Sequence, residues 1–520
     1  MLTMTACTDG FEDLNTNKYE ATEEMMETDN LKIGAYYSQM QSRVVLFDDG
    51  TGNCLSSDYQ VAQGLAHDLY SGYIGPSGTW RNGQGHNAHY SFVDGWYNQL
   101  FSRAFSELMP AWQTVSKQAE EMSLPQIKAM ADIVKVEGMH RVADSYGPIP
   151  YLSFGSGNLA ATYDALDKVY EQFFAELDEA IDILTPYAET GAKLLSDYDY
   201  IYEGDVEKWV KFANTLRLRL ALRVVYANET LARTEAEKSA ANPIGFIENK
   251  NERAELLHSR LTYFHPNYDI AYNFNAGEIR MAASMDSYMN GYQDPRLDKY
   301  FVKAADGKFH GIRLGVLNIN ADKYSGSGIS NLNIDKGTTP IVWMTAAESH
   351  FLRAEAALRG WNMGGSAQSF YESGISASFA ENEAGNASSY ISNKTRKPAD
   401  YSDPTGDSNN HAAMSTITIA WEDGATFEKN LERIITQKWI AMYPDGCEGW
   451  TEYRRTGYPK LFPVVRNMSN GLVNTDLQVR RLPFPTSEYR TNEAGVQTGI
   501  DALGGPDNGG TKLWWDKRDR

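Results

Sequence analysis

The sequence predicts a mainly α-helical protein whose body folds as a single domain with long loops. Three observations support this prediction. Apolar residues recur at helical spacing in several long segments, strand-like alternation is scarce, and the segments between helices are rich in Gly, Ser and Asn. The chain has 520 residues, 42% of them hydrophobic, which is enough for a large buried core. Length alone favours several domains, but some all-helical folds run longer as one unit.

The first thirty residues contain a candidate lipid-attachment site. Cys7 follows Ala6 and short, weakly apolar residues, as in the cleavage box of a bacterial lipoprotein, where the cysteine becomes the acylated first residue. The charged segment and most of the apolar segment expected before such a box are missing. We interpret residues 1–6 as a signal-peptide remnant, 7–30 as a lipid-anchored tether and 31–520 as the helical binding domain. The alternative is that Cys7 is an incidental thiol in a loose terminus.

Four segments carry apolar residues along one helical face: 163–184, 206–226, 345–359 and 427–443. The side chains predicted to face the core are Val169, Phe173, Leu177 and Ile181 in the first, Trp209, Phe212, Leu216 and Leu220 in the second, and Leu431, Ile434, Ile435 and Trp439 in the fourth. Arginines 217, 219 and 223 flank the second face, and we expect their stems to lie over neighbouring helices. Paired helices with small residues at their crossings predict tetratricopeptide-like packing, although no strict repeat of about 34 residues is visible.

The charge and cysteine content exclude several classes of protein. The 48 basic and 68 acidic residues give a net charge of −20, which repels nucleic acid and anionic lipid headgroups. No apolar run of about 18 residues is present, so we expect contact with a membrane only through the lipid anchor. The three cysteines, Cys7, Cys54 and Cys447, have no zinc-ligand spacing, and a disulfide between Cys54 and Cys447 is left open. We expect no metal and no cofactor.

The stretch from Asp68 to Tyr97 is the leading candidate for a ligand site. A glycan presents hydroxyls at its edge and C–H groups on its faces, so a site for it needs flat aromatic rings beside paired donors and acceptors. This stretch interleaves both kinds of side chain: Tyr70, Tyr73, Trp80 and Tyr90 with Asp68, Arg81, Asn82 and His86. Trp80 is the favoured platform because it lies between Gly78 and Gly83 with no apolar periodicity around it.

Other residues in and beyond this stretch are assigned as follows. Trp96 and Phe101 continue into a helical pattern and are predicted to be core. Tyr288 and Tyr324 are secondary candidates for ligand contact, Tyr324 because it lies in a Gly- and Ser-rich loop. His67, His86 and His89 have poor spacing for a metal site, so the predicted metal-ligand set is empty.

Two other function classes remain as alternatives. A helical glycoside hydrolase needs two carboxylates about 5–10 Å apart, and Asp144 and Asp205 are the best placed by motif, although both read as parts of structural turns. No nucleophile elbow, phosphate loop or HExxH motif is present, so no catalytic residue is predicted. The second alternative is a tetratricopeptide-type scaffold that binds only proteins.

A series of short motifs, in a fixed order over nearly the whole chain, resembles the SusD/RagB family of Bacteroidota nutrient-uptake lipoproteins. They are Cys7 followed by FEDLNTN at 11–17, DSYGPIPY at 144–151, the segments 204–219 and 347–360, DPRL at 294–297, YESGI at 371–375, WTEYRRTGYP at 450–459, RLPFP at 481–485, GGPD at 504–507 and LWWD at 513–516. Most of these motifs read as structural.

The resemblance implies a single SusD-like domain built from tetratricopeptide-like helix pairs. It implies an outer-membrane lipoprotein on the cell surface that binds an oligosaccharide, or in some members a peptide. It also implies a partner, a SusC-type TonB-dependent barrel that receives the ligand. We therefore predict a glycan-capturing lipoprotein with no enzymatic activity.

Overall fold

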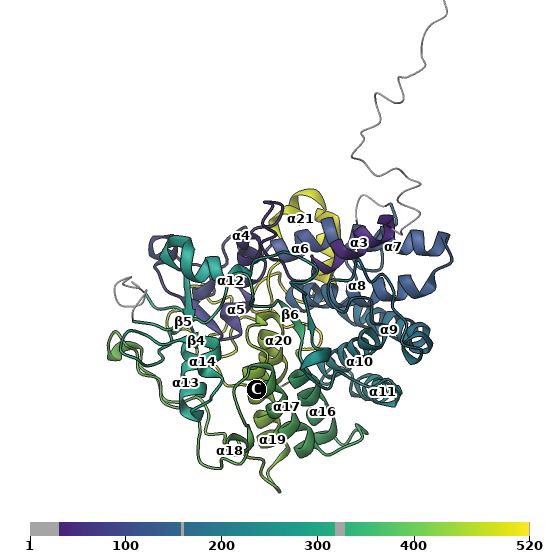
Figure 1. Ribbon diagram of the computed structural model, residues 1–520. Coiled ribbons are helices and arrows are strands. Elements are labelled where there is room, and N and C mark those ends of the chain that lie inside the picture. Colours follow the sequence, from purple (N-terminus) through teal and green to yellow (C-terminus); the bar gives the residue numbers. More distant parts are fainter. Residues whose placement is uncertain (1–30, 158–160, 318–327, 519–520) are drawn as a thin grey trace, which may run out of the picture.

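The structure, a computed structural model, describes residues 31–157, 161–317 and 328–518. Helices dominate this part of the chain, and its strands form three two-stranded antiparallel pairs (Figure 1). The predicted mainly helical class is therefore confirmed. Tyr324 and Cys7, a candidate ligand contact and the candidate lipidation site, lie outside the described residues.

Most of the longer helices contact the next long helix along the chain. Figure 1 shows α7 to α11 stacked along one side of the molecule, with α16 to α20 in the middle. The helices in order are α3 (Leu31–Gln41), α7 (Met109–Glu121), α8 (Pro125–Tyr146), α9 (Leu166–Glu189), α10 (Val206–Arg223), α11 (Glu229–Ala241), α13 (Ala283–Tyr292), α16 (Ala346–Leu358), α17 (Ala367–Glu381), α19 (Phe427–Ala441), α20 (Gly446–Thr456) and α22 (Glu493–Leu503).

Local capping explains where several predicted helices begin. The side chain of Asp205 accepts a hydrogen bond from the backbone N–H of Lys208 at the start of α10, and Thr345 does the same for α16. All twelve side chains predicted to face the core, in α9, α10 and α19, are buried. Gly360, with φ of 79°, follows the end of α16 in the left-handed conformation that stops a helix. Asp205 thus has a structural role, as its motif suggested.

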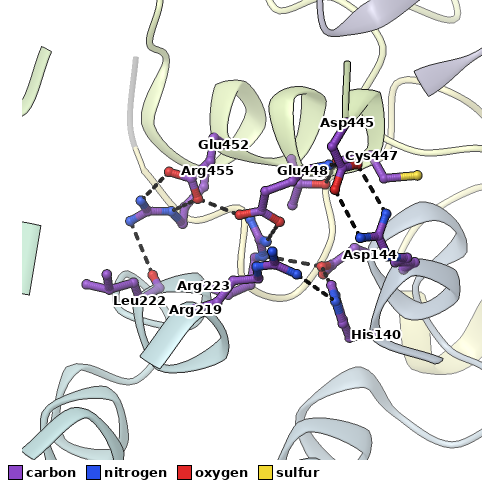
Figure 2. Close-up of polar contacts among 12 residues, drawn as sticks. His140, Asp144, Arg219, Leu222, Arg223, Asp445, Cys447, Glu448, Glu452 and Arg455 are labelled. Carbon is purple, nitrogen blue, oxygen red and sulfur yellow. Dashed lines mark hydrogen bonds and ion pairs between the residues drawn. The ribbon is translucent and has the colours of Figure 1, made fainter. Parts of the chain in front are cut away.

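The arginines of α10 lie against neighbouring helices, as expected, and their charged ends are buried there as well. Arg219 makes a two-pronged pair with Glu348 of α16, at 2.8 and 2.7 Å. Arg223 pairs with Glu448 of α20 and, at 3.2 Å, with Asp144 of α8. Figure 2 shows Arg219 and Arg223 among the side chains of α8 and α20. At the centre of the helix stack, these ion pairs take the place of apolar contacts. Helical periodicity in the sequence does not reveal that these arginines are buried.

These pairs belong to one connected buried ion-pair network. Its cations are Arg141, Arg219, Arg223, Arg359, Lys438 and Arg455, and its carboxylates are Glu137, Asp144, Glu348, Glu355, Asp445, Glu448 and Glu452. His140 lies within this network, 3.2 Å from Glu137 and 3.4 Å from Asp144. Burial lowers the pKa of His140, but these two carboxylates outweigh it and raise the pKa above its usual value. A protonated His140 balances six cations against seven carboxylates.

The strand pairs connect segments that are distant in sequence. β1 (Ile74–Pro76) pairs with β3 (Ile279–Met281), and Ile74 lies opposite Met281. β2 (Ala254–Glu255) pairs with β6 (Val342–Met344), and β4 (Phe301–Val302) pairs with β5 (Asn331–Leu332). The first pair matters for function, because it places the loop after β1 beside the loop before β3.

The cysteines and the membrane prediction can be compared with the described part of the chain. Cys54 and Cys447 are buried free thiols, so no disulfide joins them. No helix among the described residues is long and apolar enough to cross a membrane.

Candidate functional site

A cavity of about 430 Å³ lies where the two loops joined by the β1–β3 pair meet the segment before α5 (His67–Tyr70). The backbone N–H of Ser77 donates to the carbonyl of Glu278 at 3.0 Å, and the Ser77 hydroxyl donates to the carbonyl of Gly277 at 2.6 Å. These bonds fix the two loops side by side. The cavity is lined by Gln60, Val61, Leu65, Gly78, Thr79, Trp80, Arg81, Trp96, Asn275, Gly277 and Glu278.

Both loops contain residues in an unfavourable backbone conformation. Arg81 and Asn82 have φ of 50° and 53°, and Asn275 and Ala276 have φ of 48° and 62°. Residues other than glycine rarely adopt this left-handed backbone conformation. Where they do, they cluster at binding sites, because the surrounding structure holds them there. Four of them in two adjacent loops therefore mark this cavity as a candidate site.

Two tryptophans form the aromatic wall of the cavity. Trp80 is 8% exposed, and its ring meets that of Trp96 edge to face, with 5.9 Å between centroids. Trp96 is partly buried, and His86 packs behind Trp80 at 5.3 Å. Burial lowers the pKa of His86 to about 3, so its imidazole is neutral at neutral pH. The aromatic wall is therefore backed by a rigid uncharged ring.

Polar side chains line another part of the cavity. The Gln60 amide donates to Glu278 at 2.5 Å, and the Asn275 amide donates to the other oxygen of the same carboxylate. Arg81 is exposed and donates to the carbonyl of Gly85 at 2.8 Å. Paired amides and a carboxylate beside indole rings can bind the hydroxyls of a sugar while a ring contacts its C–H face.

The structure brings only part of the predicted ligand set to this cavity. Trp80 and Arg81 line it, Asn82 is exposed in the same loop, and His86 lies behind Trp80. The predicted site and the observed cavity thus share the segment around residue 80.

The remaining described candidates occupy the core, and the expectation that they face a ligand is wrong. Tyr73 is fully buried, stacks on Trp439 at 5.3 Å and donates to its carbonyl at 2.6 Å. Tyr70, Tyr90 and Tyr288 are also buried, as is Asp68, which accepts hydrogen bonds from Tyr59 and Gln63. The local sequence could not show this, because the covering residues come from α19 and α20, far along the chain.

Sequence reasoning missed most of the polar side of the cavity and misplaced Trp96. Trp96 was predicted to be core, whereas it is partly buried and lines the cavity; Phe101 is core, as predicted. Gln60 and Glu278 carry no local signal, because only the fold places them opposite Trp80. The Asn-Ala-Gly run at 275–277 is a turn signal that could have drawn attention to this loop.

The two carboxylates singled out for the hydrolase alternative both have structural contacts. Asp144 lies in the buried ion-pair network and Asp205 caps α10. Within the described ranges, no group of three or more His, Cys, Asp and Glu side chains is arranged to hold a metal ion.

Comparison with known proteins decides the family. The model of the SusD-like family, described as SusD and RagB outer membrane lipoproteins, matches residues 13–516. The chain belongs to the SusD-like family. This confirms the resemblance inferred from the sequence motifs, and it supports the predicted class of nutrient-binding outer-membrane lipoprotein.

Solved structures of other SusD-like proteins resemble this one along nearly their whole length. A chitin-binding SusD homologue from Flavobacterium johnsoniae is 40% identical, with a TM-score of 0.88, over 93% of this chain and 98% of that one. A SusD homologue from Bacteroides uniformis is 37% identical, with a TM-score of 0.86, over 94% and 99%. One from Bacteroides vulgatus is 36% identical, with the same TM-score and coverage. No curated protein sequence matches this SusD-like protein.

Proposed function

We propose that this SusD-like protein captures an oligosaccharide at the bacterial surface and delivers it to a SusC-type TonB-dependent barrel. The observation that carries the proposal is the cavity in which Trp80 and Trp96 face Gln60, Asn275 and Glu278. It combines an aromatic wall with paired hydrogen-bonding groups on strained, fixed loops, which suits a polyhydroxylated ligand.

Chito-oligosaccharides are the first ligands to test, because the 40% identical Flavobacterium johnsoniae relative is described as chitin-binding. A neutral sugar also suits the electrostatics of the cavity, since its one carboxylate, Glu278, is offset by one cation, Arg81. We expect weak binding, with Kd between about 1 μM and about 1 mM, because the contact area of a small open site is limited.

Isothermal titration calorimetry with chitohexaose, maltohexaose and a mixed peptide library tests the ligand class. The proposal expects heat of binding with at least one oligosaccharide. A response to peptides alone would replace the glycan with a peptide ligand. Chromatography of the same sugar after prolonged incubation tests the hydrolase alternative, which requires new reducing ends.

Anchoring and orientation need a separate test in cells. We propose that Cys7 is acylated and that the binding domain faces the medium. Labelling with radioactive palmitate should mark the wild type and not the Cys7→Ser variant, and protease added to intact cells should digest the wild type. Loss of labelling in both proteins would reject acylation at Cys7.

The barrel partner is tested by purification from outer membranes. A tagged SusD-like protein should retain a TonB-dependent barrel in mild detergent, and deletion of that barrel should stop oligosaccharide uptake without changing binding by the isolated protein. Retention of soluble proteins in place of a barrel would favour the scaffold alternative.

A further inference from the structure

A second, larger cavity, of about 680 Å³, lies apart from the Trp80 cavity, and the two share no lining residue. The β2–β6 pair forms one wall, with Val342 and Trp343 on β6. Tyr300 of α14 (Leu297–Tyr300), Glu381 at the end of α17 and Met442 just after α19 contribute other walls. A cavity of this size falls in the range that binds small molecules.

The two cavities lie on either side of one short segment. In the π-helix η1 (Gln60–Gly64), Gln60 and Val61 line the Trp80 cavity, whereas Gln63 lines the larger one. A π-helical turn is rare and is frequently found at functional sites. Gln63 is itself held in place, because its amide donates to Tyr59 at 2.9 Å and to Asp68 at 3.1 Å.

Most charges in the walls of the larger cavity are already paired within the wall. Arg141 lies 3.0 Å from Asp445, Lys250 lies 3.2 Å from Glu383, and Arg253 pairs with Glu255. A ligand with a large net charge therefore finds few free counter-charges. A neutral polar ligand avoids the desolvation cost that a charged one meets in such a place.

Three lining side chains nevertheless carry a buried polar atom without a hydrogen bond among the described residues. They are an acceptor, Glu381 Oε2, and two donors, Trp343 Nε1 and Arg253 Nε. Glu381 is 8% exposed and Trp343 is 1% exposed. Buried polar atoms are rarely left unpaired, and each exception calls for a missing partner such as a water molecule or a ligand. Unpaired acceptors and donors around one cavity match hydroxyl groups, which donate and accept.

Burial also affects the charge of Glu381. It raises the pKa of this carboxyl to about 7, although Arg253 and the backbone amides of Ala346 and Ala347 act in the opposite direction. One oxygen of Glu381 accepts from the Ala346 amide at 2.8 Å, which fixes the side chain at the cavity wall. The carboxyl is thus held at the cavity wall, where its second oxygen, Oε2, can form a hydrogen bond with a ligand hydroxyl.

We propose that this cavity is a second binding site, which takes a neutral polyhydroxylated molecule of mono- or disaccharide size. Glu381 and Trp343 supply the hydrogen bonds, and the apolar side chains of β6 contact the C–H face of the ligand. The site is independent of the oligosaccharide site at Trp80, so either can fail without the other.

Saturation-transfer difference NMR with chitobiose, cellobiose and maltose tests the proposal in the Trp80→Ala, Trp96→Ala background, which removes both rings of the aromatic wall of the first site. At least one disaccharide should still bind. Adding Val342→Phe, which places a bulkier side chain in the wall of the second cavity, should abolish that signal. Val302→Phe is the matched control, because Val302 is a 44% exposed strand residue outside both cavities.

Glu381→Gln provides a second variant that keeps the size of the side chain, and we expect it to weaken the residual binding at least about tenfold. Circular dichroism checks that each variant is folded. The proposal is overturned if no disaccharide binds the Trp80→Ala, Trp96→Ala protein. It is also overturned if the residual signal survives both Val342→Phe and Glu381→Gln.

Discussion

Buried side chains in this protein have two different kinds of surroundings. Trp80 and Trp96 are largely covered yet border a cavity, so their rings are held rigidly where a sugar can reach an edge or a face. His140, by contrast, is enclosed by charges from several helices: Glu137 and Asp144 on its own helix, Arg219 on α10 and Glu448 on α20. We propose that the first arrangement serves a ligand, whereas the second joins helices within the core.

We predict that His140 keeps its proton to a higher pH than an exposed histidine does. Its pKa is raised in the folded protein, so its contribution to stability is fully present below the unfolded pKa of about 6.5 and is lost as the pH rises through the folded pKa. NMR titration of ¹⁵N-histidine-labelled protein should show this imidazole still protonated when exposed histidines are neutral. Replacement by Gln should cost most stability below about pH 6.5, and a neutral His140 at that pH would contradict the prediction.

At the crossing of α16 and α17, a small residue decides how closely the two helices approach each other. Gly374 of α17 faces the ring of Phe351 of α16, and a Cβ atom at Gly374 would lie 2.8 Å from two ring atoms. Phe351 is fully buried, which leaves its ring no room to turn away. The glycine is thus required by the crossing, despite its poor helix propensity.

Gly374→Ala should therefore destabilise the protein. Alanine gains about 1 kcal/mol of helix propensity, but forcing a methyl group against a packed ring costs about 1–3 kcal/mol. Urea denaturation should show a net loss of unfolding free energy. Ser376→Ala, at an exposed position of the same helix, is the control and should change stability by less than about 0.5 kcal/mol. A stabilised Gly374→Ala protein would show that the crossing can relax.

The helices could be predicted from the sequence, whereas several of their buried contacts could not. Apolar periodicity predicts α9, α10, α16 and α19 to within a few residues, because their faces and caps are local features. The buried arginines and the polar side of the Trp80 cavity are not local. Glu278 meets Gln60 only because β1 pairs with β3 across more than two hundred residues. Trp80 could be singled out by its glycine-rich surroundings, but its partners could not.

The whole molecule combines buried groups that respond to pH in opposite directions. Stability is gained as the pH rises through groups with lowered pKa values: His67, His86 and His265, each about 3, and Glu137 and Glu355, each about 2. Each of these contributions is fully present above the unfolded pKa and is lost as the pH falls through the folded pKa. Asp68 and Glu381, each raised to about 7, act in the opposite sense between about 4 and about 7.

The net result should be a maximum of unfolding free energy near neutral pH. Three histidines gain stability between about pH 4 and about pH 6.5, whereas two carboxyls lose it, and His140 adds a loss above that range. Urea denaturation from about pH 4 to about pH 8 should place the maximum at about pH 6 to 7. A maximum below about pH 5 would mean that the raised carboxyl pKa values dominate.

We propose that the helical frame fixes the aromatic wall of the Trp80 cavity and that this wall binds a sugar. Calorimetric titration of chitohexaose into Trp80→Ala and Trp361→Ala tests it most directly. Trp361 is also a buried tryptophan, 4% exposed, but it lines neither cavity. We predict that Trp80→Ala weakens binding at least about tenfold, whereas Trp361→Ala binds as the wild type does. Equal, undiminished binding by both folded variants would contradict the account.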